Sequence, residues 1–294
     1  MIFTASALTA FAANSLLCRG ALARAALDPA SFSTIRLGSG AATLLLITLS
    51  TRRSSIGLGG SWGSAALLFL YAVPFSFAYV SLGAGTGALI LFGAVQTTML
   101  VAALSSGERP HVVQWSGLIL ALGGLVYLVL PGLAAPSPAG CALMATAGVA
   151  WGVYSLRGRG ASNPLAETAG NFARSVPLAV GVSIAAAPHA AFNAEGVLLA
   201  VVSGALASGL GYVAWYAALS GLSATRAASV QLAVPVLAAA GGVIFLSERV
   251  TVRLIVAALL ILGGVALALT RTERRRRRPH PPEERPAPEP ATRP

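Results

Sequence analysis

The chain has 294 residues, of which 56% are hydrophobic and only 10% are charged, whereas an ordinary soluble domain is about one-quarter charged. This composition excludes a soluble globular protein, because such a fold needs far more polar surface. The formal net charge is +11, and all 20 basic residues are arginine. No basic face of a folded domain is expected, so nucleic acid is not an expected partner. Two cysteines, Cys18 and Cys141, lie in apolar stretches and indicate neither a disulfide framework nor a metal site.

Long apolar runs predict ten membrane-spanning helices, because one span needs about 20 apolar residues. The runs do not alternate, so we expect an all-α membrane protein rather than a β-barrel. Few residues separate the third span from the fourth and the eighth from the ninth, which predicts two antiparallel hairpins. The expected spans are residues 2–18, 29–49, 60–81, 86–104, 112–130, 139–156, 164–187, 196–219, 224–246 and 252–270.

The arginines also predict how the chain crosses the membrane. An N-terminus in the cytoplasm places twelve arginines of the loops and tail inside and four outside, which is the distribution that membrane insertion favours. We therefore expect a multi-pass protein of the bacterial inner membrane with both termini in the cytoplasm. The tail, residues 271–294, is rich in Arg, Pro and Glu and is predicted to be disordered. Its basic run either anchors this topology or contacts anionic lipid headgroups.

The chain repeats itself at an offset of 140 residues. Glu108–Arg109 matches Glu248–Arg249, and the pair Gly123–Gly124 matches Gly263–Gly264. Internal self-similarity of this kind indicates two structural repeats of one unit.

Two five-helix repeats are therefore predicted, at residues 1–135 and 136–270. Five is an odd number, so the two halves insert with opposite orientation and form an inverted-topology repeat. This arrangement is typical of secondary transporters, which place their substrate site near the middle of the membrane between the repeats.

Short motifs recur in the same order in both halves and cover the chain except for its tail. They are Pro29 with Arg36, Tyr79, Glu108–Arg109 and Gly123–Gly124 in the first half, and Trp151–Gly152, Tyr216, Pro235, Leu246–Arg249 and Gly263–Gly264 in the second. With these motifs the chain resembles the ten-span, EamA-like members of the drug/metabolite transporter superfamily. The segment 78–96 is similar, in addition, to the bacterial exporters of aromatic amino acids in that superfamily.

The resemblance implies a carrier with a central cavity that opens alternately to each side. It implies export of amino acids, with aromatic or large apolar side chains favoured. Another small molecule carried by the same fold is the alternative, because one fold serves many substrates. The expected partners are the small-molecule substrate and the lipid bilayer. The sequence does not determine an oligomeric state, and a monomer is compatible with it.

Three amide side chains, Asn14, Gln96 and Gln231, lie well inside their predicted spans. An unpaired amide is costly in hydrocarbon, so each must face protein or a water-filled cavity. A neutral amide can bind the carboxylate or the ammonium group of a zwitterion. The alternative is hydrogen bonding between helices, which is common in membrane proteins.

Aromatic residues form a second set of candidates for the substrate cavity: Tyr79, Trp151, Tyr154, Trp215 and Tyr216. Their rings can bury a flat apolar side chain and attract an ammonium group. The alternatives are the aromatic belt at the membrane surface and ordinary packing.

Arg36 and Arg174 fall within predicted spans, where a charged side chain is expensive and therefore suggests function. Either guanidinium could attract a carboxylate, although Arg36 could instead extend toward the membrane surface. Pro74, Pro177 and Pro235 also fall within spans. A proline inside a helix frees a carbonyl and permits a kink, so these three are candidates for gating positions.

No acidic residue is predicted at the middle of the membrane. Glu108 and Glu248 lie at span ends beside arginines, where local pairing or helix capping is expected. A proton- or sodium-coupled carrier usually has an acid at membrane depth, so we expect uncoupled transport that is insensitive to a pH gradient.

No motif for catalysis, phosphate binding or metal binding occurs, so we expect no cofactor and no enzymatic activity. A lipid-handling membrane protein is a further alternative from a different functional class. Such a protein needs a lateral opening, which the sequence cannot reveal.

Overall fold

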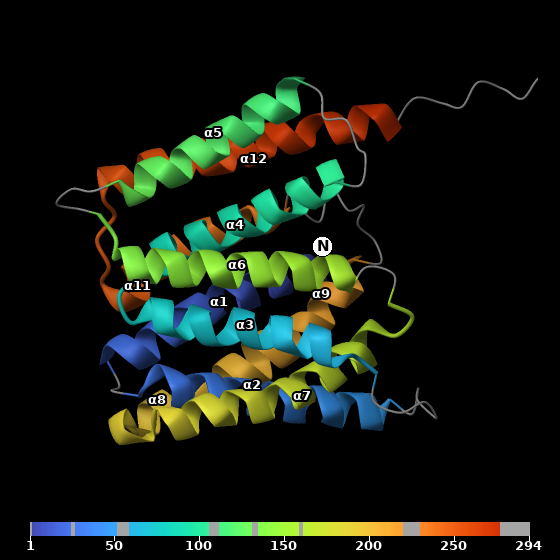
Figure 1. The fold of residues 1–294 in the computed structure, drawn as a ribbon, viewed down its shortest axis with the longest axis vertical. Coiled ribbons are helices and arrows are strands. Elements are labelled where there is room, and N and C mark those ends of the chain that lie inside the picture. Colours follow the sequence, from blue (N-terminus) through green and yellow to red (C-terminus); the bar gives the residue numbers. More distant parts are fainter. Residues whose placement is uncertain are drawn as a thin grey trace, which may run out of the picture.

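The computed structural model describes residues 2–24, 27–51, 59–105, 112–130, 135–158, 161–219 and 230–276. Within these ranges all regular secondary structure is helical and there is no strand. The long helices lie side by side, nearly parallel or antiparallel to one another (Figure 1). The expectation of an all-α protein is therefore confirmed for the described part of the chain.

The helices follow the predicted spans in order. α8, the π-helix η2 and α9 succeed one another without a break and form one continuous helical segment, and η1 is a short 3-10 helix. The bounds are α1 (Ile2–Arg24), α2 (Pro29–Ser50), α3 (Trp62–Tyr79), α4 (Ala84–Ser105), α5 (Val112–Val129), α6 (Pro138–Arg157), α7 (Pro164–Ala185), η1 (Ala187–His189), α8 (Ala194–Val202), η2 (Ser203–Leu210), α9 (Gly211–Leu219), α11 (Ala233–Leu246) and α12 (Val252–Arg276).

Among the described residues, five helical segments are long and apolar enough to cross a membrane. They are Ile2–Ala23, Pro29–Ser50, Trp62–Tyr79, Pro138–Arg157 and Ala194–Ala218. Shorter apolar stretches are Ala84–Met99, Trp115–Leu128, Ala233–Leu246 and Val252–Leu267. The chain is therefore rich in apolar helices of membrane-spanning length, and the number of ten spans stays a prediction.

In three helices, α2, α6 and α7, a polar side chain caps the first turn and a proline follows the cap. Asp28 caps α2 by accepting a hydrogen bond from the backbone N–H of Ser31 at 2.8 Å, and Asn163 caps α7 by accepting one from Ala166 at 3.2 Å. A proline follows each cap at the first helical position, where its missing N–H has no helical partner to lose.

Two helices are longer than the sequence predicts. α1 continues to Arg24, six residues past the predicted end of its span, and α12 continues to Arg276, into the predicted tail. Ala, Leu and Arg are strong helix formers, so these helices extend beyond the stretch that hydropathy alone defines. The remainder of the tail, residues 277–294, lies outside the described residues.

The helices form a core between two outer pairs. α5 and α12 pack against each other at one edge of the molecule, and α2 with α7 lies at the opposite edge (Figure 1). α1, α3, α4, α6, α9 and α11 lie between these edges. Side chains on these central helices are therefore covered by protein on several sides, as a site for polar groups inside a membrane requires.

The short turn between α3 and α4 does not produce the packed hairpin that its length predicts. α3 packs mainly against α6 and α7, whereas α4 packs mainly against α6 and α11, so α6 separates them. Gly148 of α6 allows this approach, because a Cβ there would lie 2.6 Å from both Ala94 Cβ and the Leu91 carbonyl oxygen of α4. The turn between the eighth and ninth predicted spans lies outside the described residues.

Candidate functional site

A stretch of π-helix, η2, packs against α1 and α2 and contributes two buried serines to a polar centre. In η2, the hydroxyls of Ser203 and Ser208 both donate to the side-chain oxygen of Asn14 on α1, at 2.8 and 3.4 Å. Residues five apart on an α-helix point about 140° away from each other. The i→i+5 pattern of a π-helix brings them to one side, so η2 allows both serines to reach Asn14.

Arg36 of α2 is buried beside this cluster, with 2% of its surface exposed. Its Nε donates to the Ser208 hydroxyl at 3.3 Å and its Nη2 donates to the Tyr71 hydroxyl at 2.9 Å. Its guanidinium carbon lies 5.2 Å from the ring centre of Tyr71 and 4.8 Å from that of Phe75. Its Nη1 is buried without a hydrogen-bond partner.

The charge of Arg36 is incompletely compensated. Among the described residues no carboxylate forms an ion pair with it, and its neighbours are neutral hydroxyls and aromatic rings. A buried charge without a counterion costs several kcal/mol, and the aromatic faces recover only part of that. The centre is therefore chemically suited to a negatively charged group that can accept from Nη1.

Aromatic rings extend this centre from α3 across α6 to α9. Tyr71 lies 4.9 Å from Trp151 of α6, which stacks on Tyr154 at 5.6 Å and meets Tyr212 of α9 edge-on at 5.4 Å. Trp151 and Tyr154 are 9% and 5% exposed. These two residues, predicted from the sequence to line a cavity, are thus brought into one cluster with Arg36 through Tyr71.

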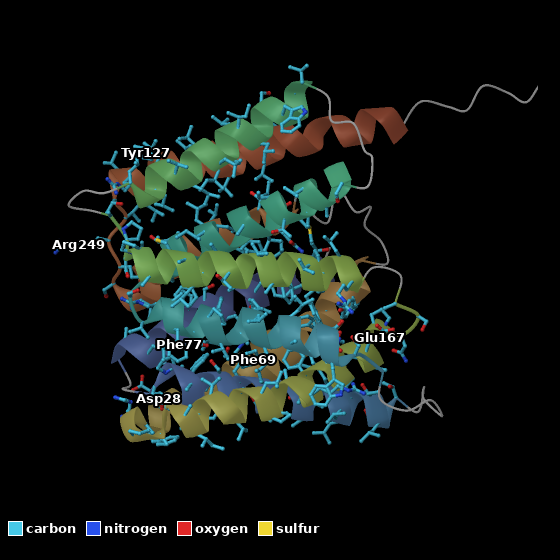
Figure 2. All side chains as sticks on the ribbon, viewed as in Figure 1. Asp28, Phe69, Phe77, Tyr127, Glu167 and Arg249 are labelled. Atoms are coloured by element: carbon cyan, nitrogen blue, oxygen red, sulfur yellow. The ribbon has the colours of Figure 1, made fainter. Side chains whose placement is uncertain are left out.

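Hydrogen bonds tie the far side of this cluster to α7. The Tyr154 hydroxyl accepts from Asn171 Nδ2 at 3.3 Å, and the Asn171 side-chain oxygen accepts from the backbone N–H of Ser61 at 2.9 Å. Tyr216, another predicted residue, shares a hydrogen bond of 3.0 Å with the hydroxyl of Thr168. These contacts lie toward the end of the molecule where Glu167 is found (Figure 2).

Other predicted residues lie away from this cluster or beside it. Tyr79 is fully buried, and its hydroxyl donates to the carbonyl of Ala84 at 3.3 Å. Trp215 packs against Phe11 in a separate small cluster with Ala7.

Gln96 and Gln231 are both buried, at 7% and 8% exposure, and Nε2 of Gln96 has no hydrogen-bond partner. Burial of these amides agrees with their expected contact with protein. Their expected role in a cavity stays a prediction.

The second predicted guanidinium is engaged by backbone. Arg174 Nη1 donates to the carbonyls of Gly59 and Gly170, at 2.7 and 3.1 Å, so it is less available to a carboxylate than Arg36.

The three prolines also differ from one another. Pro74 and Pro177 lie inside α3 and α7, as expected of kink positions. Pro235 is the third residue of α11 and follows a turn at Leu232 that separates α11 from helical Val230 and Gln231, so it lies near an interruption of the helical path, and its role in gating stays a prediction.

Sequence reasoning missed several residues of the centre. Tyr71, Phe75 and Tyr212 belong to aromatic-rich stretches of the chain, but nothing in those stretches distinguishes them from their neighbours. Ser203 and Ser208 carry no signal at all, because their five-residue spacing matches no α-helical face. The Tyr212 hydroxyl, like Arg36 Nη1, is buried without a partner, so a ligand that bonds to both would complete the site.

Comparison with known proteins relates this chain to one family. A model of the EamA-like transporter family matches residues 138–270. The uncharacterized protein PA1977 of Pseudomonas aeruginosa is 51% identical over 269 residues, which cover 92% of this chain and 94% of that protein. The chain belongs to the EamA-like transporter family.

A solved crystal structure shows the same fold as this EamA-like chain. The two chains align over 93% of this chain and 98% of the chain in that structure, with a TM-score of 0.65 and 20% sequence identity. Members of the EamA-like family are integral membrane proteins and transporters rather than enzymes. The matched residues include Trp151, Tyr154, Ser208 and Tyr212, whereas Arg36 comes from the half of this EamA-like protein that precedes the match.

Proposed function

We propose that this EamA-like protein exports amino acids with aromatic or large apolar side chains, by alternating access through its centre and without coupling to an ion. It acts in the bacterial inner membrane with both termini in the cytoplasm. Its ten spans form two inverted repeats, residues 1–135 and 136–270. The closer likeness of residues 78–96 to bacterial exporters of aromatic amino acids supports this choice of substrate.

One observation carries the substrate class. Arg36 is a buried cation with a free Nη1 and no carboxylate partner among the described residues. The carboxylate of an amino acid supplies the missing counterion and the missing acceptor, and charge-assisted hydrogen bonds of this kind are stronger than neutral ones. A zwitterion also brings an ammonium group, which the neighbouring faces of Tyr71 and Trp151 can attract.

Helix pairing supports the inverted repeat. In the predicted repeats α1 corresponds to α6, α3 to α9 and α4 to α11. The contact between α3 and α6 therefore has its counterpart in the contact between α9 and α1, and the contact between α4 and α6 has its counterpart in the contact between α11 and α1. The pairs α2–α7 and α5–α12 each join corresponding members of the two halves. A two-fold axis in the membrane plane relates such pairs in inverted-repeat transporters.

The test uses purified protein in liposomes with no ion gradient. Uptake of labelled phenylalanine, tryptophan, leucine, alanine and a sugar is measured, with phenethylamine as an unlabelled competitor that lacks the carboxylate. We expect saturable entry of the bulky amino acids and little competition by phenethylamine. In Arg36→Lys, affinity for phenylalanine should fall at least about tenfold, because a bond to a buried charge is lost or weakened. Arg253→Lys, which changes a partly exposed arginine of α12, is the matched control.

Each part of the proposal can fail separately. Equal competition by phenylalanine and phenethylamine would show that the carboxylate does not contribute to binding. Selective entry of the sugar would show that the cargo is a sugar and not an amino acid. A clear increase in uptake when a proton gradient is imposed would show that transport is coupled to protons, contrary to the proposal.

A lipid-handling role is the second candidate, favoured by one feature of the surface. An apolar groove of about 840 Å³ runs along α1 between α8 and the end of α11, and its lining includes Thr9, Leu199 and Phe245. Lipid scrambling in the same liposomes, measured with a fluorescent phospholipid, would favour this role if it exceeded that of empty liposomes.

A further inference from the structure

Glu248, two residues after the end of α11, reaches across to the start of another helix. Its two carboxylate oxygens accept from the backbone N–H of Ala84, the first residue of α4, at 3.1 and 2.8 Å. A carboxylate at a helix N-terminus is stabilised by the free N–H groups and the helix dipole. The sequence suggested that this acid pairs locally or caps a helix, and the structure shows a cap on a helix 164 residues away.

Arg19 of α1 completes the same cluster. Its Nε lies 3.3 Å from Glu248 Oε1, and its Nη1 donates to the carbonyls of Tyr79 and Val80, at the end of α3, at 2.9 and 3.0 Å. The two side chains are 23% and 22% exposed, so the pair is screened from solvent more than an ordinary surface ion pair. It is the only ion pair found within the described ranges.

The backbone around Glu248 is built for this contact. Ser247 adopts a left-handed conformation with φ of 55°, which turns the chain back over the end of α11. A Cβ on Gly242 would lie 2.6 Å from Glu248 Oε2, and one on Gly83 would lie 3.0 Å from the same atom. Glycine at both positions leaves the room that the carboxylate occupies.

These contacts join four helices at one end of the molecule. Arg249, the residue after Glu248, lies at the same end as Asp28 and opposite to Glu167 (Figure 2). α1, α3 and α4 belong to the first predicted repeat, and α11 belongs to the second. We infer that Arg19 and Glu248 form a latch that holds this end of the transporter closed and must open in each cycle. The inference rests on the proposed alternating access and assigns no cargo.

The latch also gives Tyr79 a different role from cavity lining. Its backbone carbonyl accepts from Arg19, its hydroxyl donates to Ala84, and its ring packs edge-on against Phe75 at 4.7 Å. Because Phe75 also lies on the guanidinium of Arg36, Tyr79 connects the latch to the candidate site. Opening of the latch therefore frees the side chains that cover this site from one side.

Native Cys18 reports on the latch without any cargo. It precedes Arg19 in α1 and is fully buried, so a membrane-impermeant maleimide should label it slowly in a Cys141→Ser background. We expect Glu248→Gln and Arg19→Gln to raise the labelling rate at least about fivefold, as for loss of a modest coupling between two states. The amide side chain in Glu248→Gln keeps an acceptor for Ala84, so folding should survive, which gel filtration in detergent checks.

Two comparisons make the result decisive. Arg253→Gln removes a positive charge elsewhere, from an arginine that donates to the carbonyl of Leu130, and should label Cys18 at the wild-type rate. Equal rates in Arg253→Gln and in both latch variants would overturn the latch. Faster labelling without amino acid uptake in the liposome assay would keep the latch and reject the proposed cargo.

A disulfide tests whether opening occurs at this gap. A Cβ on Gly242 would lie 3.5 Å from that of Ala84, at the lower end of the range for a disulfide, about 3.5–4.5 Å. In Arg19→Gln, Cys141→Ser protein, the oxidised pair Ala84→Cys and Gly242→Cys should return Cys18 labelling to the slow rate. Fast labelling despite a complete cross-link would overturn the inference.

Discussion

At the scale of single residues, the centre of this transporter is a set of polar groups that bond mainly to one another. Asn14 is bonded to two serines and Arg36 to a serine and a tyrosine, all buried. A polar group removed from water must find a partner inside the protein, and two groups of this centre, on Arg36 and Tyr212, have none. This shortage of acceptors is the chemical reason to expect an anionic group in the cargo.

Tyr71→Phe tests the hydrogen bond that supports Arg36. The substitution removes the acceptor of Arg36 Nη2 and leaves a second unpaired donor, so we expect the protein to lose about 1–3 kcal/mol of stability. Thermal unfolding in detergent measures the loss. Tyr127→Phe on α5, in the outer pair (Figure 2), removes the same atom far from the centre. Equal thermal unfolding midpoints for the two variants would show that the hydrogen bond between Arg36 and Tyr71 does not stabilise the protein.

At the scale of helices, small residues decide which helices approach closely. The repeated glycine pairs illustrate this for α5 and α12. A Cβ on Gly124 would lie 2.7 Å from Leu260 Cβ, and one on Gly264 would lie 2.6 Å from the backbone nitrogen of Ala121. Gly123 and Gly263 have nothing within 4 Å of the same position. One glycine of each pair therefore makes the helix contact, at corresponding places in the two predicted repeats.

Gly124→Ala and Gly123→Ala form a matched pair of substitutions. We expect the first to destabilise the protein by about 1–3 kcal/mol, because the new methyl group overpacks the contact with α12. The second should be neutral or stabilising by about 0.5–1 kcal/mol, since alanine is the better helix former. Unfolding midpoints in detergent give both values, and a reversed order would refute this account of the α5–α12 contact.

At the scale of the whole molecule, the ends of the helices form two faces. Arg249 and Asp28 lie at one end and Glu167 lies at the other (Figure 2). The arginine distribution predicts that the first end faces the outside and the second the cytoplasm. The latch of Arg19 and Glu248 would then close the outer face, which is the exit side in the proposed export of amino acids.

Single cysteines test this orientation in intact cells, in a Cys18→Ser, Cys141→Ser background. An impermeant maleimide should label Arg249→Cys in intact cells, because Arg249 is exposed at the end predicted to face outward. Ser162→Cys, an exposed position close to Glu167, should label only after the cells are opened. The reverse pattern would invert the assigned orientation, and with it the side that the latch closes.

Hydropathy and local motifs predicted the helical class and the approximate helix order, because these depend on composition and on neighbouring residues. The family resemblance was equally visible, since its motifs recur along the chain. Contact of Asn14 and Gln96 with protein also followed from their depth in apolar runs, whereas for Arg36 the sequence allowed both burial and extension toward the membrane surface.

Only the tertiary structure decided which residues meet. Glu248 bonds to Arg19 across 229 residues, α6 separates α3 from α4, and a π-helix turns Ser203 and Ser208 to one side. A sequence pattern reports interactions within a turn or two of one helix, where spacing determines the geometry. The choice of a distant partner depends on how whole helices pack, which no local spacing encodes.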